Sequence, residues 1–537
     1  MLDERQGRGR RECVVLAALL SGIALCWILL TPPGAGPDEP GHLVRAGALA
    51  HGQLDGSDIG SRRDRGFDLP ATYVLPDPTC YAHHPDVPVS CAPAASGSEA
   101  TVTLPSNADE YPIWGHLPGG LLTLLPGLAP IWWARLGGAA VAIALVSGAL
   151  WLIAPRRPLG AAAIVLALTP MAWSMFAVVN PSAMAIGGAV ALWAGLLYGG
   201  ARPAPSAAWL TALGWAALAL PRRDGLIWAC VALVVALGHG GWPAAEWWRS
   251  LGVGPQIVVA ASTLVTMAWG VTNDSRVSRL VVLAPLIVVA AEVVRWWWRE
   301  RATTWAPRVG VVTVVALAGG LATGAALASR PGGWDGDLAT RIAGESGNNF
   351  IEAIGRLGWL DAPLPAASIA LVCGAIGLLG AASLTVETAA MRWAAGLLLT
   401  AVAASWLFEL YQGNTTGTYW QGRYSLPLLA GIPLLLGLAR VPPDVGSRVA
   451  GWAGGIALLV LNVAAWASSR RWGVGIDGSM MPWDWDTIHT PLPPIVVLAA
   501  LAALSVALAA TLRRIATPPG RASHSSPGNR SPARCSS

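Results

Sequence analysis

The sequence predicts an all-α polytopic membrane protein, and its composition, run length and periodicity each support that fold class. Of its 537 residues, 54% are hydrophobic and only 12% are charged, which excludes an ordinary soluble domain and a disordered chain. Apolar runs of about 20 residues, the length at which a helix crosses a bilayer, recur as far as residue 511. The runs lack the alternation of a membrane barrel, so we expect helices, which satisfy their own backbone amides in lipid.

About fourteen of these runs, in a range of about 11 to 14, are predicted to span the membrane. The first run follows four arginines, as a signal peptide would, but it is longer than a typical signal core and we interpret it as a span. The predicted spans are residues 12–31, 131–154, 158–177, 182–200, 207–220, 225–238, 254–271, 280–294, 309–328, 366–385, 393–411, 424–439, 449–467 and 493–511.

The distribution of arginine predicts the orientation. All 35 basic residues are arginine, the net charge is +5, and more than half of the arginines lie in segments on one side of the predicted spans. The positive-inside rule makes that side cytoplasmic. We therefore expect a cytoplasmic amino terminus (1–11), a polytopic domain (12–511) and a cytoplasmic Ser/Pro/Arg-rich tail (512–537) that is disordered. The long predicted extracytoplasmic loops are 32–130, with interfacial helices, 329–365 and 468–492.

Charged residues are scarce at the centres of the spans. Arg135, Glu292 and Glu409 lie close to span ends. An ion-coupled transporter usually places charges at membrane depth, so the sequence favours chemistry at the outer interface over passage through the bilayer. The long loops, where function concentrates, all lie on the predicted outer side.

Two cysteines share the polar first loop. Cys80 and Cys91 lie on the predicted oxidising side, so we expect a disulfide between them. His83 and His84 lie between them and leave a zinc site as an alternative, although this spacing matches no common structural zinc motif.

The stretch "PDEPGHLVRA" (37–46) places acids, a histidine and an arginine just after the first span. A helix that starts near its second proline puts Asp38, His42 and Arg45 on one face, and we expect it to lie in the outer membrane interface. Asp38 as a helix cap and Glu39 as a first-turn acid are the structural alternative. Two adjacent acids beside a histidine also make a candidate catalytic site.

Arginines on the predicted outer side are candidate phosphate ligands. In "YWQGRYSLPLL" (419–429), Arg423 lies at an outer turn with Gln421 and Tyr424 beside it, and a guanidinium suits bidentate phosphate binding. An interfacial aromatic belt explains the tyrosine equally well. Arg222 in "PRRDG" (221–225) is a second candidate, unless Asp224 simply pairs with it.

Two further polar residues occupy outer turns. Asn180 in "NPSAMAI" (180–186) is a candidate substrate ligand, although it also fits a helix cap before a proline. Asp361 in "FIEAIGRLGWLDAPLP" (350–365) lies before the entry to a predicted span, where membrane anchoring is the alternative explanation for this stretch.

Four of these stretches, in this order and spacing, resemble the bacterial membrane protein family labelled domain of unknown function 2142. They are "PDEPGHLVRA", "LALTPMAWSMFAVVNPSAMAI", "GRLGWLDAPLP" and "QGRYSLPLL", and the resemblance covers about residues 15 to 510. The family looks like the GT-C glycosyltransferases, whose first extracytoplasmic loop carries an acidic motif. This chain departs from its relatives at Ser182, where an acid is common, and at "YPIWGH" (111–116), where a Pro-Pro-aromatic run is common.

The resemblance implies transfer of a sugar from a polyprenyl-phosphate carrier to a cell-envelope glycan or glycolipid outside the bacterial cytoplasmic membrane. Asp38 or Glu39 would be the base, with His42 orienting the pair, and Arg423 and Arg222 would stabilise the phosphate. Alternatively, the two acids bind Mg²⁺ or Mn²⁺. A flippase or exporter of a lipid-linked saccharide and a non-catalytic assembly protein are the competing functions. No nucleotide-binding signature is present, and no nucleic-acid partner is expected.

Overall fold

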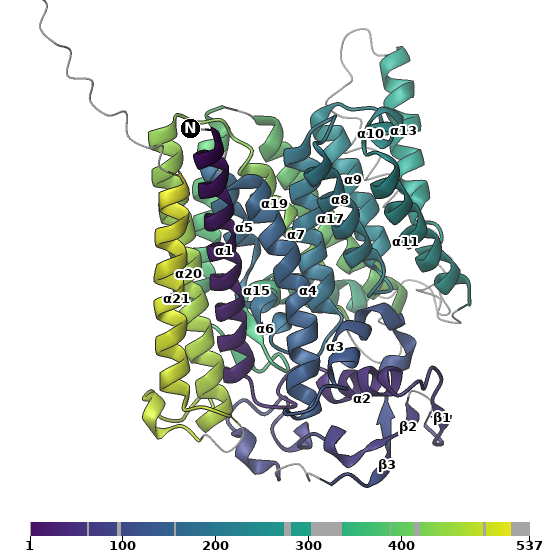
Figure 1. Ribbon diagram of the computed structural model, residues 1–537. Helices are drawn as coiled ribbons and strands as arrows, with labels where there is room; N and C mark the ends of the chain where they lie inside the picture. Colours follow the sequence, from purple (N-terminus) through teal and green to yellow (C-terminus); the bar gives the residue numbers. More distant parts are fainter. Residues whose placement is uncertain are drawn as a thin grey trace, which may run out of the picture.

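The computed structural model is a bundle of long helices with a small folded unit at one end (Figure 1). The amino-terminal end of α1 lies at the upper end in this view, and α2, α3 and β1–β3 lie at the lower end. The structure describes residues 2–61, 64–93, 98–154, 157–272, 281–301, 336–386, 388–412, 419–486 and 490–516.

The α-helices of the described residues are α1 (Leu2–Leu30), α2 (Glu39–Ala50), α3 (Leu117–Leu122), α4 (Pro130–Ile153), α5 (Pro158–Ala167), α6 (Pro170–Phe176), α7 (Ser182–Gly199), α8 (Pro205–Ala219), α9 (Gly225–Gly240), α10 (Ala244–Ser250), α11 (Val253–Thr272), α13 (Ala284–Arg301), α15 (Gly336–Gly355), α16 (Ala366–Leu384), α17 (Thr388–Gln412), α18 (Leu426–Leu429), α19 (Gly431–Leu436), α20 (Pro443–Val474) and α21 (Pro494–Ala516). The strands are β1 (Ser57–Asp58), β2 (Arg65–Pro70), β3 (Thr101–Ser106), β4 (Arg356–Leu357) and β5 (Ala362–Pro363). Short 3₁₀ turns include η4 (Ala108–Glu110), η5 (Ile113–Gly115) and η6 (Gly422–Ser425).

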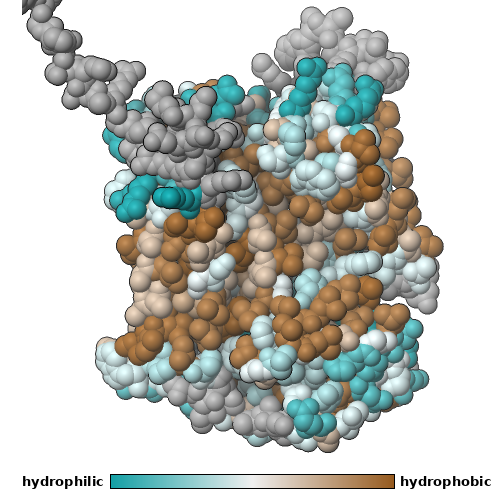
Figure 2. Space-filling view, viewed as in Figure 1, coloured by the Kyte–Doolittle hydropathy of each residue, from teal (hydrophilic) through white to brown (hydrophobic). Residues whose placement is uncertain are grey.

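Seven helices within the described residues are long and apolar enough to cross a membrane, and two bent helix pairs raise the number to nine. This establishes a multi-pass membrane protein, whereas the count of fourteen stays a prediction. The first predicted span corresponds to the shorter apolar helix Val14–Leu30. The predicted span 309–328 and residues 517–537 of the predicted disordered tail lie outside the described residues. A hydrophobic belt crosses the middle of the molecule, with hydrophilic surface at both ends (Figure 2).

The predicted span 158–177 is broken rather than continuous. Helices α5 and α6 meet at an angle of 66°. Pro170 has no amide hydrogen and disfavours helical geometry at the preceding residue, so the chain restarts there as a new helix. Thr169 caps α6 through the amide of Ala172 at 3.4 Å, and its hydroxyl donates to the Ala353 carbonyl of α15 at 2.9 Å. The break therefore ties α6 to the helix that later positions Arg423.

The first loop corrects the all-α prediction, because it contains a three-stranded antiparallel sheet in the order β1-β2-β3. Phe67 of β2 pairs with Leu104 of β3, and Phe67 and Leu69 are fully buried while the residue between them is exposed. This period-two alternation buries one face of β2 against α2, with Leu43 and Val44 in the same core. The sequence analysis did not single out this short alternating segment.

Helix α2 is enclosed by protein, which corrects the expectation of an amphipathic helix lying in the membrane interface. Its residues 43–49 are all buried, and the sheet and α3 pack against it. Gly41 permits this approach, because a side chain there would collide with the amide oxygen of Asn107, and Ser106 donates to the Gly41 carbonyl at 2.7 Å. The polar face of α2 is therefore turned toward other protein groups.

Candidate active site

Asp38 lies at the point where the chain enters α2, in an unusual backbone conformation. Its φ of 60° is in the left-handed region, which aspartate tolerates better than most residues, and its side chain caps no amide of α2. Asp38 is thus the N-cap residue of α2 and Glu39 lies in its first turn, as the structural alternative expected, but Asp38 makes no side-chain capping bond. The Asp38 side chain is 38% exposed, and its Oδ2 pairs with Nη2 of Arg423 at 3.0 Å across 385 residues of sequence.

Arg423 is presented by a 3₁₀ turn that packs directly on the backbone of α15. Gly422 makes this packing possible, because a Cβ there would collide with the carbonyl oxygen of Asn349. The Gly422 amide donates to Glu352 of α15 at 3.0 Å, and Glu409 at the end of α17 accepts the amides of Tyr419 and Trp420. Two buried carboxylates thus hold the turn in place.

Two guanidinium nitrogens of Arg423 are unused. The residue is 4% exposed, and among the described residues its Nε and Nη1 have no hydrogen-bond partner. A buried charge normally has its donors satisfied, because an unpaired buried donor costs free energy. The Asp38–Arg423 ion pair is therefore buried on the arginine side and partly exposed on the aspartate side. Two of its arginine donors make no hydrogen bond with the described residues.

Arg222, at the turn between α8 and α9, flanks this pair. Its Nη1 donates to the Ser182 hydroxyl at 2.9 Å, and its Nε pairs with Asp224 at 2.9 Å, as the alternative reading of that turn expected. Burial alone would lower the pKa of Arg222, but Asp224 and the nearby tyrosines raise it, so the group stays charged. Its guanidinium lies over the Tyr424 ring at 4.8 Å, and that of Arg423 over the same ring at 5.3 Å.

Tyr424 therefore joins the two arginines, and Gln421 lies beside them on the same turn. The Oε1 of Gln421 is buried and has no partner among the described residues. Its orphaned oxygen is a further polar atom without a bond next to Arg423.

His42 lines another side of the site, together with His116 and Tyr111, which the sequence did not indicate. His42 Nδ1 lies 3.0 Å from Nε2 of His116, and its ring meets Tyr111 edge-on at 5.2 Å between centroids. Burial, together with Arg423 and Arg222, lowers the pKa of His42 to about 3, and burial lowers that of His116 well below its usual value. Both rings are therefore neutral at physiological pH and exchange a single hydrogen bond.

Glu39, adjacent to Asp38, has a different environment. It is fully buried, and Arg135 of α4 binds both of its oxygens at 2.8 Å. The amides of Gly34 and Val179 donate to the same carboxylate at 3.0 and 2.9 Å. Arg135 also donates to the carbonyls of Ile28, Thr31 and Pro32 at the end of α1. Glu39 thus holds the first loop to α1, α4 and the entry to α7, and no oxygen remains for a substrate.

The donor set does not fit the metal alternative. The carboxylate of Glu39 is occupied by Arg135 and two amides, and Asp38 pairs with the guanidinium of Arg423. Mg²⁺ and Mn²⁺ need several oxygen ligands, and the described residues contain no cluster of three or more metal-ligating side chains. No step is therefore assigned to a metal.

Asn180 supports the acidic motif without forming part of the Asp38–Arg423 pair. Its Oδ1 accepts the amide of Ser182 at 2.9 Å, and its Nδ2 donates to the Pro37 carbonyl at 3.4 Å. It thus caps the start of α7, as the sequence analysis allowed, and also holds the residue before Asp38.

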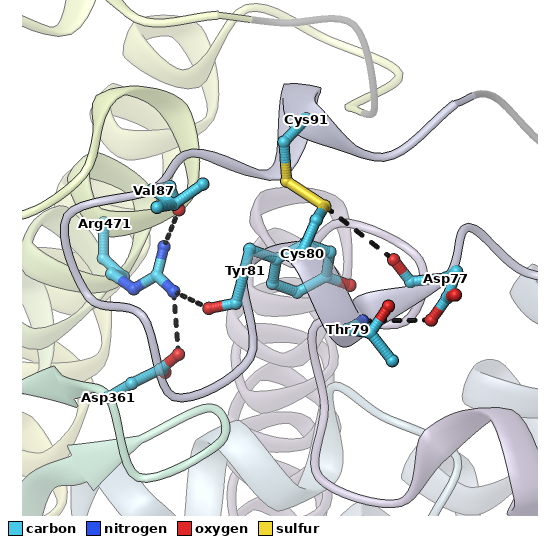
Figure 3. The surroundings of a disulfide bond; sticks show 8 residues. All are labelled: Asp77, Thr79, Cys80, Tyr81, Val87, Cys91, Asp361 and Arg471. Atoms are coloured by element: carbon cyan, nitrogen blue, oxygen red, sulfur yellow. Dashed lines mark hydrogen bonds and ion pairs between the residues drawn. A yellow bond between two sulfur atoms is a disulfide. The ribbon is translucent and has the colours of Figure 1, made fainter.

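Asp361 belongs to a separate cluster around the disulfide (Figure 3). Its Oδ2 pairs with Arg471 of α20 at 2.7 Å, and the same guanidinium donates to the carbonyls of Tyr81 and Val87. Cys80 and Cys91 are disulfide-bonded with their Cα atoms 6.2 Å apart, so their sulfurs are not free to ligate zinc. The cluster joins residues of all three long loops, which therefore meet at one end of the bundle.

Several site residues escaped the sequence analysis because they carry weak local signals. Tyr111 and His116 bound the "YPIWGH" stretch, noted only as a departure from relatives, and Glu352 resembles any acid of an amphipathic helix. Arg135 was seen near a span end, but nothing in the sequence indicates that Glu39 is its partner.

Comparison with known proteins places the chain in a family. Residues 19–432 match the family described as predicted membrane protein (DUF2142). The chain belongs to this family. The resemblance to domain of unknown function 2142 is thereby confirmed, and the DUF2142 region contains Asp38, Asn180, Arg222 and Arg423. No curated protein matches the chain. Among solved structures, the crystal structure of ArnT from Cupriavidus metallidurans bound to undecaprenyl phosphate is similar at 15% identity and a TM-score of 0.37, over 93% of this chain and 76% of that one.

Proposed function

We propose that the protein is a membrane-embedded glycosyltransferase that moves a sugar from a polyprenyl-phosphate donor to a cell-envelope glycan or glycolipid on the extracytoplasmic side. One observation carries the proposal. Arg423 pairs with Asp38 through Nη2 while its buried Nε and Nη1 have no partner among the described residues. A phosphate group, which offers several oxygen acceptors, suits the two unused N–H donors of a buried guanidinium.

The proposed reaction is a single displacement. The acceptor hydroxyl oxygen attacks the anomeric carbon of the donor sugar, and Oδ1 of Asp38, which no described residue bonds, takes the hydroxyl proton. The bond between the anomeric carbon and the phosphate oxygen breaks, and polyprenyl phosphate leaves with the electron pair. Arg423 and the charged Arg222 stabilise the negative charge on the departing phosphate. A single displacement by the hydroxyl oxygen, with Asp38 as the base, inverts the anomeric centre.

His42 and His116 serve as a neutral wall in this proposal. Because both rings stay uncharged, they add no cation that would compete with the arginines for the phosphate. The Glu39–Arg135 pair is assigned to positioning, since it holds the loop that carries Asp38.

Substitution of Arg423 tests the proposal. Purified protein in liposomes is incubated with a panel of polyprenyl-phosphate monosaccharides and envelope glycolipid acceptors, and glycosidic products and released polyprenyl phosphate are measured by mass spectrometry. Loss of a donor that stabilises a developing anion typically costs about 10²–10³ in rate, and we expect that loss for Arg423→Gln. Arg448→Gln is the matched control, because that arginine lies exposed in a surface pair with Asp444.

Three outcomes would overturn the proposal. Equal turnover by Arg423→Gln and the control would remove Arg423 from the reaction. Movement of labelled lipid-linked saccharide across the bilayer without any new glycosidic bond would favour the flippase alternative, and unaltered envelope composition in cells carrying the Asp38 and Arg423 substitutions would favour an assembly protein.

A further inference from the structure

A polar cavity of about 340 Å³ lies in the first loop beside α2. Its wall is formed by the carboxyl end of α2, the segment leading into β1, the start of β2, and η4. This volume is within the range of small-molecule sites. The lining residues are Arg45, Leu54, Asp55, Gly56, Arg65 and Asp109. This end of the molecule has a hydrophilic surface below the hydrophobic belt (Figure 2).

Arg45 is the unusual residue in this wall. It is 4% exposed, its Nη1 donates to the Leu54 carbonyl at 2.8 Å, and its guanidinium lies over the Phe67 ring at 5.4 Å. Its Nε has no hydrogen-bond partner within the described part of the chain, and no carboxylate there lies within ion-pair distance of it. A buried guanidinium with an unused donor at the edge of a cavity indicates a ligand group that accepts hydrogen bonds.

The rest of the wall decides which class of ligand fits. Arg65 contributes a second guanidinium, 3.9 Å from Asp109, while Asp55 and Asp109 contribute acceptors. Two cations and two carboxylates cancel in charge, so a strongly anionic ligand would face repulsion from the acids. Burial raises the pKa of Asp109 despite Arg45 nearby, which indicates that this wall is partly desolvated. Sugar hydroxyls donate and accept hydrogen bonds, and they match a wall of alternating donors and acceptors.

We infer that this cavity is a carbohydrate subsite that holds a hydroxyl-bearing unit of the acceptor glycan, with Arg45 and Asp109 as its inner contacts and Asp55 and Arg65 at its rim. Its role as an acceptor subsite rests on the proposed glycosyl transfer; its capacity to bind sugar does not. Asp38 immediately precedes α2 and Arg45 lies in the middle of that helix, so about 10 Å along the helix axis separates them. The loop from Asp109 to Tyr111 runs beside them, since Asp109 faces Arg45 and Tyr111 contacts His42. The cavity and Asp38 thus belong to the same folded unit of the first loop.

Direct binding tests the carbohydrate subsite without any turnover. Saturation-transfer NMR on the full chain in nanodiscs is run with a panel of methyl glycosides of pyranoses and furanoses, and separately with inorganic phosphate. We expect at least one glycoside to bind, and Asp55→Asn and Arg65→Gln to weaken it at least about fivefold, the effect of one lost charged hydrogen bond. Both residues are exposed, so these variants keep the fold. Glu99→Gln, an exposed acid outside the cavity, is the control.

The outcomes separate the subsite from the proposed reaction. Absence of glycoside binding, equal binding by all variants, or binding of phosphate in place of glycosides would overturn the subsite, whatever the enzyme does. If the wild-type chain transfers sugar, Asp55→Asn and Arg65→Gln should raise the acceptor KM and leave kcat unchanged, whereas a purely structural role would move neither. Absence of transfer with retained glycoside binding would overturn the acceptor role and the proposed function, and would leave the carbohydrate site standing.

Discussion

Two neighbouring acids in the first loop have opposite environments, although they differ by one methylene group. Glu39 is fully buried, and Arg135, two amides and the carbonyls at the end of α1 complete every bond of that ion pair. Asp38 is 38% exposed, and its partner Arg423 keeps two buried donors unused. The saturated pair organises the fold, and the unsaturated pair is the one with capacity for a ligand. Saturation of hydrogen bonds and burial, rather than charge, distinguish the two.

Removal of the Glu39 charge should have the largest effect. In Glu39→Gln, the fully buried Arg135 loses its counter-ion, and an uncompensated buried charge typically costs about 3–5 kcal/mol. We expect a strong drop in the thermal unfolding midpoint, measured by tryptophan fluorescence on the detergent-purified protein. We also expect a low yield of folded protein. A thermal midpoint equal to that of wild type would show that the pair does not hold the loop.

Asp38→Asn should leave the fold intact and remove the activity. The buried Arg423 loses its counter-ion, but asparagine keeps an oxygen that can accept from Nη2 and the position is partly exposed, so we expect a stability loss of about 1–3 kcal/mol, smaller than at Glu39. Loss of a general base typically lowers the rate by about 10²–10⁴, measured as sugar transfer per folded protein in liposomes. Asp58→Asn, in the same loop and exposed, is the control. Full turnover by Asp38→Asn would exclude Asp38 as the base.

Loss of the disulfide should destabilise the protein without altering the site. The bridge joins two cysteines that are 11 residues apart in sequence, and Arg471 binds carbonyls of the segment between them. The double variant Cys80→Ser with Cys91→Ser should therefore lower the free energy of unfolding by about 2–3 kcal/mol. Addition of reductant to the wild-type protein should lower its thermal midpoint by the same amount as the double substitution does. Because the Asp361 cluster is separate from the Asp38–Arg423 pair, the transfer rate per folded protein should not change; a change beyond about threefold would show that the clusters are coupled.

The smallest effect concerns pH. In the unfolded chain His42 titrates near its ordinary value, but in the folded protein burial lowers its pKa to about 3. Between these values only the unfolded chain binds the proton, so stability falls as pH decreases, by about 1.4 kcal/mol per pH unit for each such histidine. His116 acts in the same direction. Thermal midpoints at pH 7 and pH 5 should differ less in His42→Gln than in wild type; an unchanged difference would mean that His42 is charged when folded.

The sequence by itself determined the membrane class, the family motifs and most of the polar residues that meet in the candidate site. Apolar run length depends on composition alone, and it predicts the seven long apolar helices that the described residues contain, because a helix satisfies its backbone within its own segment. The run 158–177 predicts one continuous span. The structure breaks it between α5 and α6, and Pro170 explains the break. The sheet in the first loop was missed because its strands are short and its partners are far apart in sequence.

Only the tertiary structure decided which polar residues meet. "PDEP" presents two acids that look equivalent, and nothing local shows that one pairs with a residue 96 positions away and the other with a residue 385 positions away. Asp361 looked as suitable as Asp38 until its pairing with Arg471 placed it in another cluster. Local sequence determines helices through short-range hydrogen bonds and apolar pattern, whereas a site depends on long-range contacts, and in this chain those contacts separate a saturated charge from an unsaturated one.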